Sequence, residues 1–141
     1  MSQCIEWRHD GTRLIVTVRV LPPFIGTNLD GLDGRALIDT GSTTTGIRQH
    51  AARALGLKGI GKRPMSTVGG DTQIERYVFR IGLAEAPKPD QPPTFPFIFE
   101  EIVGFELRDG FTFDVLLGMD ILKQCSLSFD SRGNCRLAFG Q

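Results

Sequence analysis

The chain has 141 residues, of which 40% are hydrophobic and 23% charged, a composition typical of one globular domain spanning 1–141. The 16 basic and 16 acidic residues give a formal net charge of zero, which argues against nucleic acid or an anionic membrane as partner. No apolar stretch approaches membrane-spanning length, and the N-terminus lacks the apolar segment of a signal peptide, so we expect a cytoplasmic protein.

Three cysteines are present, at Cys4, Cys125 and Cys135. An odd number cannot pair completely within one chain, and no two have the spacing of metal ligands. We therefore expect three reduced thiols, no metal and no cofactor.

The N-terminal part has the alternating pattern of β-strands. Apolar and polar residues alternate over Leu14–Val20, and Pro22-Pro23 ends this strand because proline cannot donate to a ladder. Asp10-Gly11 predicts a hairpin turn that pairs this strand with Cys4–His9. Further turns are predicted at Asp30-Gly31 and Asp33-Gly34, before the next strand.

One main helix is predicted over about 46–56. Its apolar face would consist of Ile47, Ala51, Ala54 and Leu55. Thr44 or Thr45 could cap its start, and Gly56 suits its end.

Two strands separated by a glycine turn are predicted next, over 63–68 and 73–81. Five of the chain's 8 prolines then fall within residues 84–96, which predicts a loop inserted into the domain. Phe105–Leu107 and Phe111–Phe113 flank Asp109-Gly110 and predict another hairpin.

The C-terminal part begins with the apolar run Val115–Leu122, which should be buried and turn at Gly118 into a short second helix at about 119–124. A last hairpin is expected from Leu127–Asp130 and Cys135–Phe139.

The most informative motif is Asp39-Thr40-Gly41-Ser42, directly after the apolar run Ala36–Ile38. Alone, an Asp-Thr-Gly triplet is typical of a tight turn. A carboxylate at the end of a buried strand is nevertheless costly unless function requires it there. The helix, the glycine hairpin and the Leu117-Gly118 run that follow favour the functional interpretation.

In this order the motifs resemble one lobe of an aspartic protease, specifically the single-lobe, retroviral-type (retropepsin-like) family in its cellular and bacterial form. The resemblance covers about residues 10–140. It implies an all-β fold, an acid-protease-like single lobe that forms a closed barrel or sandwich with a flap hairpin. It also implies an endopeptidase that binds a polypeptide in extended form.

Aspartic proteases activate water between two carboxylates that share one proton. This chain has only one Asp-Thr-Gly and is too short for a second lobe. The resemblance therefore implies a homodimer in which the Asp39 of each subunit meets at the two-fold axis.

The resemblance also implies roles for neighbouring residues. Thr40 should bond across the dimer interface, Gly41 should allow close approach of substrate, and Ser42 should donate a hydrogen bond to Asp39. The last bond would favour the ionised carboxylate, so we expect an acidic pH optimum that Ser42→Ala moves upward. The remaining site residues are the flap residues Val68, Gly69, Gly70 and Asp71, and the structural pair Leu117 and Gly118.

Two other interpretations stay open at the level of sequence. The same fold could serve as a non-catalytic peptide-binding or dimerisation module. Alternatively, the chain could be a monomeric β-protein with a chance turn motif, which predicts no two-fold interface at Asp39.

Overall fold

The computed structural model describes residues 3–23, 30–67, 69–84, 89–91, 97–108 and 110–139. Strands dominate, with two short helices among them. In chain order the elements are β1 (Gln3–Arg8), β2 (Ile15–Leu21), β3 (Leu32–Ile38), β4 (Gly46–Arg48), α1 (Gln49–Ala54), β5 (Lys62–Thr67), β6 (Gly70–Leu83), β7 (Phe97–Leu107), β8 (Val115–Leu117), α2 (Met119–Leu122), β9 (Ser126–Phe129) and β10 (Asn134–Phe139).

The larger sheet has seven strands in the order β2-β3-β8-β4-β7-β6-β5, and it closes on itself because β6 also pairs with β2. The length of β6 permits this closure. Its first part, Gly70–Glu75, pairs with β5, and its last part, Arg80–Leu83, pairs with β2 on one side and β7 on the other. The predicted all-β fold is confirmed, and β5 and β6 form the expected hairpin.

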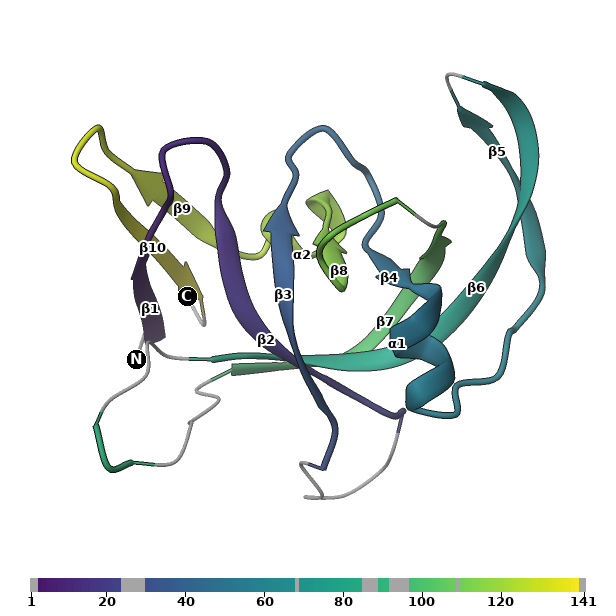
Figure 1. The fold of residues 1–141 in the computed structure, drawn as a ribbon, viewed down its shortest axis with the longest axis horizontal. Helices are drawn as coiled ribbons and strands as arrows, with labels where there is room; N and C mark the ends of the chain where they lie inside the picture. The colour runs from purple at the N-terminus through teal and green to yellow at the C-terminus, as the bar shows by residue number, and fades with distance from the viewer. Residues whose placement is uncertain are drawn as a thin grey trace.

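A second sheet has three strands in the order β1-β10-β9 and lies beside the larger one (Figure 1). In the view of Figure 1, the 9–14 turn, the end of β3 and the β5–β6 hairpin all point to the upper side of the molecule. One hydrophobic core joins the two sheets; buried residues from both include Ile5, Val18, Ala36, Phe79, Val115, Leu117, Leu137 and Phe139.

The predicted pairing of Cys4–His9 with Leu14–Val20 is wrong, because β1 pairs antiparallel with β10 and β2 pairs with β3. Asp10-Gly11 does form a turn, with Gly11 at φ +88°. The Asp10 carboxylate accepts hydrogen bonds from the backbone N–H groups of Thr12 and Arg13, at 2.8 and 2.9 Å. The turn therefore connects two different sheets instead of two paired strands.

Asp33-Gly34 is not a turn, since both residues lie within β3. Asp33 forms an ion pair with Arg19 of the adjacent strand at 2.6 Å. At Gly34, a Cβ atom would lie 2.7 Å from the Asp114 carboxylate, so glycine serves here for close packing.

The predicted helix is shorter than expected. Ile47 belongs to β4 and not to the helix, which spans only Gln49–Ala54 and has no side-chain cap at Arg48. Thr45 lies before β4 and hydrogen bonds elsewhere. Gly56 follows the helix at φ +67°, as expected for a residue that ends one.

The predicted hairpin around Asp109-Gly110 is also wrong. β7 ends at Leu107, residues 111–113 form no strand, and β4 separates β7 from β8 in the sheet. The β5–β6 hairpin, the turn from β8 into α2 and the β9–β10 hairpin are confirmed. Most of the proline-rich segment 84–96, with Val68 and Asp109, lies outside the described residues.

No helix in the described part of the chain combines the length and the apolar character that crossing a membrane requires.

Candidate active site

The candidate site is the loop that leaves β3 at Asp39. β3 runs parallel to β8, with Ile38 opposite Leu117, and the Asp39 N–H extends this pairing by donating to the Leu117 carbonyl at 3.0 Å. The Asp39 side chain is half-buried. Its Oδ1 accepts a hydrogen bond from the Gly41 N–H at 2.8 Å. The buried strand pair thus fixes the backbone of this acidic residue while its carboxyl group stays partly accessible.

Gly41 and Thr40 complete the Asp-Thr-Gly turn. A Cβ atom at Gly41 would lie 3.2 Å from Asp39 Oδ1, which is tighter than an ordinary van der Waals contact. Thr40 is exposed. Within the described ranges, its hydroxyl group makes no hydrogen bond, so it is available to a group outside this chain.

Ser42 does not make the predicted bond to Asp39. Its hydroxyl group donates to the Thr44 carbonyl at 2.8 Å, and only its backbone N–H reaches Asp39, at the carbonyl oxygen (3.3 Å). A hydroxyl has a single proton to donate, and the loop backbone places an acceptor two residues away within easy reach. Ser42 therefore stabilises the loop and not the carboxylate.

Behind the loop lies a buried polar network that the sequence did not indicate. Thr45, which is 0% exposed, donates from its hydroxyl group to Asp120 Oδ1 at 2.7 Å and from its backbone N–H to Oδ2 at 3.0 Å. The same hydroxyl accepts the Gly118 N–H at 3.1 Å. Asp120 is thus structural: it holds Thr45 and also accepts the Ile121 N–H at the start of α2.

Gly118 is the point at which the chain from β8 passes against the loop. A Cβ atom there would lie 2.6 Å from the Thr44 carbonyl carbon and 3.0 Å from the Ser42 oxygen. Next to it, the Met119 N–H donates to the Ser42 carbonyl at 2.7 Å. The structure thus brings six predicted residues together: Asp39, Thr40, Gly41, Ser42, Leu117 and Gly118.

The β5–β6 hairpin carries the other predicted site residues. Gly70 has φ +110°, and the Ser66 hydroxyl group donates to Asp71 Oδ1 across the hairpin at 2.9 Å. Near the tip, Arg108 of the neighbouring segment donates to the Thr72 hydroxyl group at 2.7 Å. In Figure 1 the tip of this hairpin stands apart from the end of β3.

A hollow of about 580 Å³ lies along the hairpin. Its walls include Met65, Gly69, Gly70 and Asp71 from the hairpin and Phe105, Leu107 and Phe111 from the facing segment. Asp39 is not part of its lining.

Two of the three thiols, Cys125 and Cys135, are poor candidates for catalysis. All three cysteines are free. Burial raises the pKa of Cys125 to about 11 and also raises the pKa of Cys135. The reactive thiolate is therefore scarce at neutral pH. The described residues contain no group of three or more His, Cys, Asp or Glu that could hold a metal ion.

Comparison with protein families matches residues 25–121 to the model described as "Aspartyl protease", and these residues include the Asp39 loop, the hairpin and Gly118. The chain belongs to the aspartyl protease family. No curated protein sequence matches it.

Two solved structures are also similar to this chain. The chain is similar to a retropepsin-like aspartic protease from Rickettsia conorii, with a TM-score of 0.62 and 14% identity over 99% of this chain and 94% of that one. It also matches the retroviral protease-like domain of Ddi1 from Leishmania major, with a TM-score of 0.49 and 16% identity over 86% and 83% of the two chains. At this identity the Rickettsia structure shows a shared retropepsin-like fold.

Proposed function

We propose that this protein is an aspartic endopeptidase that works as a homodimer, with one Asp39 from each subunit in a shared site. One observation carries the proposal: the chain contains a single Asp-Thr-Gly, whose carboxylate is held just after the buried residues Ala36 and Ile38 of β3. Peptide hydrolysis by this chemistry requires two carboxylates, one as base and one as acid.

The hydrogen bonds of the loop support this role. The Asp39 backbone is fixed by Leu117, and one oxygen of its side chain is oriented by the Gly41 N–H. Such preorganisation keeps a catalytic group in place before substrate arrives. In a symmetric dimer, the two carboxylates would lie close together, and like charges at short range favour the state in which they share one proton. Water between them would lose a proton to one carboxylate as the other protonates the substrate.

The β5–β6 hairpin is proposed as the flap over a peptide bound in extended form. The hollow along it is lined by backbone-rich residues at its tip, Gly69 and Gly70, and by apolar side chains on its other wall. Closure of the hairpin toward the Asp39 loop would exclude water from the reaction. Gly70 adopts a backbone conformation that suits such a tip.

A peptide-library assay of the wild type and Asp39→Asn tests the activity. We expect hydrolysis by the wild type and a loss of about 10⁴-fold in the variant, with an unchanged circular dichroism spectrum. Binding of peptides by both proteins without any hydrolysis would instead identify a non-catalytic binding module.

Dilution tests the dimer separately. Because a monomer would supply only one carboxylate, specific activity should fall as the protein is diluted below its dimer dissociation constant. Constant specific activity in that range would refute a shared site.

A further inference from the structure

Three arginines from three different segments line one hollow of about 250 Å³, which we call the arginine hollow. Its lining consists of Arg8 from β1, His9, Asp10 and Arg13 from the 9–14 turn, Ile15 and Thr17 from β2, and Arg35 from β3. The lining holds one aspartate against three arginines, although the chain as a whole has a formal net charge of zero. Positive charge is therefore concentrated on this part of the surface.

The register of β2 and β3 leaves Arg35 without an acidic residue opposite it. Thr17 is exposed and lies directly opposite Arg35. One pair further along the same face, Arg19 lies opposite Asp33 and forms an ion pair with it at 2.6 Å. Arg35 thus has a hydroxyl group where Arg19 has a carboxylate. Within the described residues, the Arg35 guanidinium makes no hydrogen bond and no ion pair.

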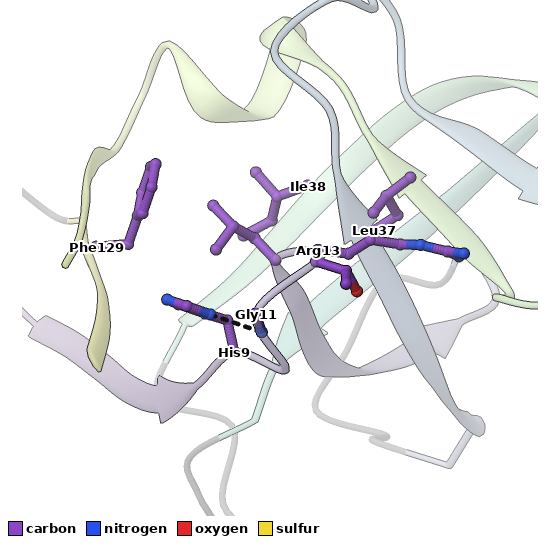
Figure 2. A pocket seen from close by; sticks show the side chains of 8 residues that line it. His9, Gly11, Arg13, Leu37, Ile38 and Phe129 are labelled. Carbon is purple, nitrogen blue, oxygen red and sulfur yellow. Dashed lines mark hydrogen bonds between the residues drawn. The ribbon is translucent and has the colours of Figure 1, made fainter. Parts of the chain in front are cut away.

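Arg13 lies beside the end of β3, because the Ile38 N–H donates to the carbonyl of the next residue, Leu14, at 2.9 Å. Arg13 is exposed and also lines an adjoining hollow of about 360 Å³, which Figure 2 draws. In that view its side chain extends past Leu37, in the direction away from Phe129. The Arg13 guanidinium, like that of Arg35, has no hydrogen-bond or ion-pair partner in the described part of the chain.

Arg8 is held in place by neutral acceptors. Its Nη1 donates to the Asn134 side-chain oxygen at 3.0 Å, and its Nη2 donates to the Arg132 carbonyl. These bonds orient the guanidinium but leave its charge uncompensated. A cation that is ordered in advance loses less conformational entropy when an anion binds to it.

The neighbouring carboxylates are engaged elsewhere. Asp10 and Asp130 each accept backbone N–H groups of the tight turn that follows them. Asp114 accepts the Arg35 backbone N–H at 3.0 Å, and the guanidinium that approaches its carboxylate is that of Arg48, at 3.8 Å. Among the described residues, no carboxylate forms an ion pair with any of the three arginines of the hollow.

From this arrangement we infer that the arginine hollow docks an acidic segment of a polypeptide, whose carboxylates pair with Arg13 and Arg35 while Arg8 adds positive charge from the end of β1. Guanidinium groups match the geometry of carboxylates, with two parallel hydrogen bonds to each. Ile15 and Thr17 also belong to the lining, which suits the side chains of a peptide better than a bare ion. Nucleic acid or an anionic membrane requires a larger basic surface than three arginines provide. The inference does not depend on peptide hydrolysis.

The test uses a fluorescein-labelled peptide of alternating Ala and Glu, and a counterpart with Gln in place of Glu. Both are titrated by fluorescence anisotropy against Asp39→Asn, which keeps the peptides intact, and against the same protein with Arg13→Gln, Arg35→Gln or both. Arg8 stays unchanged because its bonds also hold the 130–134 turn. The matched control is Arg53→Gln, since Arg53 is exposed on α1 and lines none of the three hollows.

The Glu peptide should bind Asp39→Asn about tenfold more tightly than the Gln peptide. Each substitution in the hollow should weaken binding of the Glu peptide about threefold, and both together about tenfold, because exposed ion pairs each contribute modestly. Arg53→Gln should bind like its parent. The temperature of thermal unfolding should not change, since the replaced side chains are exposed.

Equal binding of the two peptides would overturn the inference, as would a preference for Glu that survives the double substitution. An equal loss in Arg53→Gln would show a general attraction to positive charge and would also overturn it. Inorganic phosphate that binds in calorimetry, together with equal binding of the two peptides, would indicate a site for a small oxyanion instead. If the double substitution converts a dimeric parent to monomers in sedimentation, the arginines contact a second copy of the chain and the inference fails. None of these outcomes depends on whether the wild type hydrolyses peptides.

Discussion

The hydroxyl group of Thr45 donates to Asp120 Oδ1 at 2.7 Å and accepts the Gly118 N–H at 3.1 Å. This side chain thereby joins the end of the Asp39 loop to the turn between β8 and α2, although 75 residues separate Thr45 from Asp120. Buried polar groups of this kind are costly when one partner is removed, and they favour one arrangement of the segments that they join. The position of Asp39 therefore depends on a residue six places further along the chain.

Thr45→Val should destabilise the protein by about 1–3 kcal/mol, because the shape is kept while the Gly118 N–H and Asp120 each lose a partner. Urea unfolding gives the free energy. Thr43→Val is the matched control, since Thr43 is exposed and forms no hydrogen bond within the described ranges; it should stay within about 0.5 kcal/mol of the wild type. Equal stability of the two variants would contradict the structural role of Thr45.

Gly118→Ala should both destabilise the protein and lower its activity. The added methyl group would lie 2.6 Å from the Thr44 carbonyl carbon, and backbone cannot move away as a flexible side chain can. Overpacking of this kind costs about 1–3 kcal/mol, and the displaced loop carries Asp39. Thermal unfolding and kcat on one peptide measure the two effects. A variant that keeps both wild-type values would show that the loop has room at this point.

Ser42→Ala should leave the acid side of the pH–activity profile where it is in the wild type. The Ser42 hydroxyl group donates to Thr44 and not to Asp39, which removes the reason to expect an upward shift of the optimum. The lost bond should instead reduce stability by about 0.5–1.5 kcal/mol. A shift of the acid limb by about one pH unit or more would show that the hydroxyl group turns toward Asp39 in the active protein.

The turn at Asp10 should resist acid. The Thr12 hydroxyl group and the N–H groups of Arg13 and Thr12 donate to this carboxylate and lower the pKa of Asp10 to about 2. A lowered pKa in the folded state means that the stabilisation is present above the ordinary aspartate value, about 3.9. It is lost as the pH falls toward 2. A carboxyl titration followed by NMR should show this midpoint; a midpoint near 4 would contradict the hydrogen bonds of the turn.

The sequence predicted the parts of the fold that local pattern determines. The apolar run before Asp39, the glycine turn near Gly70 and the turn at Gly118 each have signals within a few residues, and the structure places all three as expected. The Asp10-Gly11 turn was also correct as a turn. Its partner strands were not, because β1 pairs with β10 at the far end of the chain, with Cys4 opposite Ala138. A two-residue turn signal is the same whichever strands flank it.

The candidate site was predicted less completely than its central motif. The sequence indicated Thr45 as a possible helix cap. Its actual partner is Asp120, which only the tertiary fold brings to Thr45. The edge-to-face contact of His9 with Phe129 had no local signal at all, since it joins residues from the two ends of the chain. Ser42 was placed correctly beside Asp39, but the direction of its hydroxyl group depends on the carbonyl of Thr44.

Subunit mixing tests the shared site most directly. Wild type is mixed with a ninefold excess of Asp39→Asn, allowed to exchange subunits, and assayed per wild-type chain. If each site requires one Asp39 from each of two subunits, random pairing should reduce the activity per wild-type chain to about one tenth. Activity per wild-type chain that does not change with the excess of variant, after exchange has been verified, would show that a single chain carries the complete site.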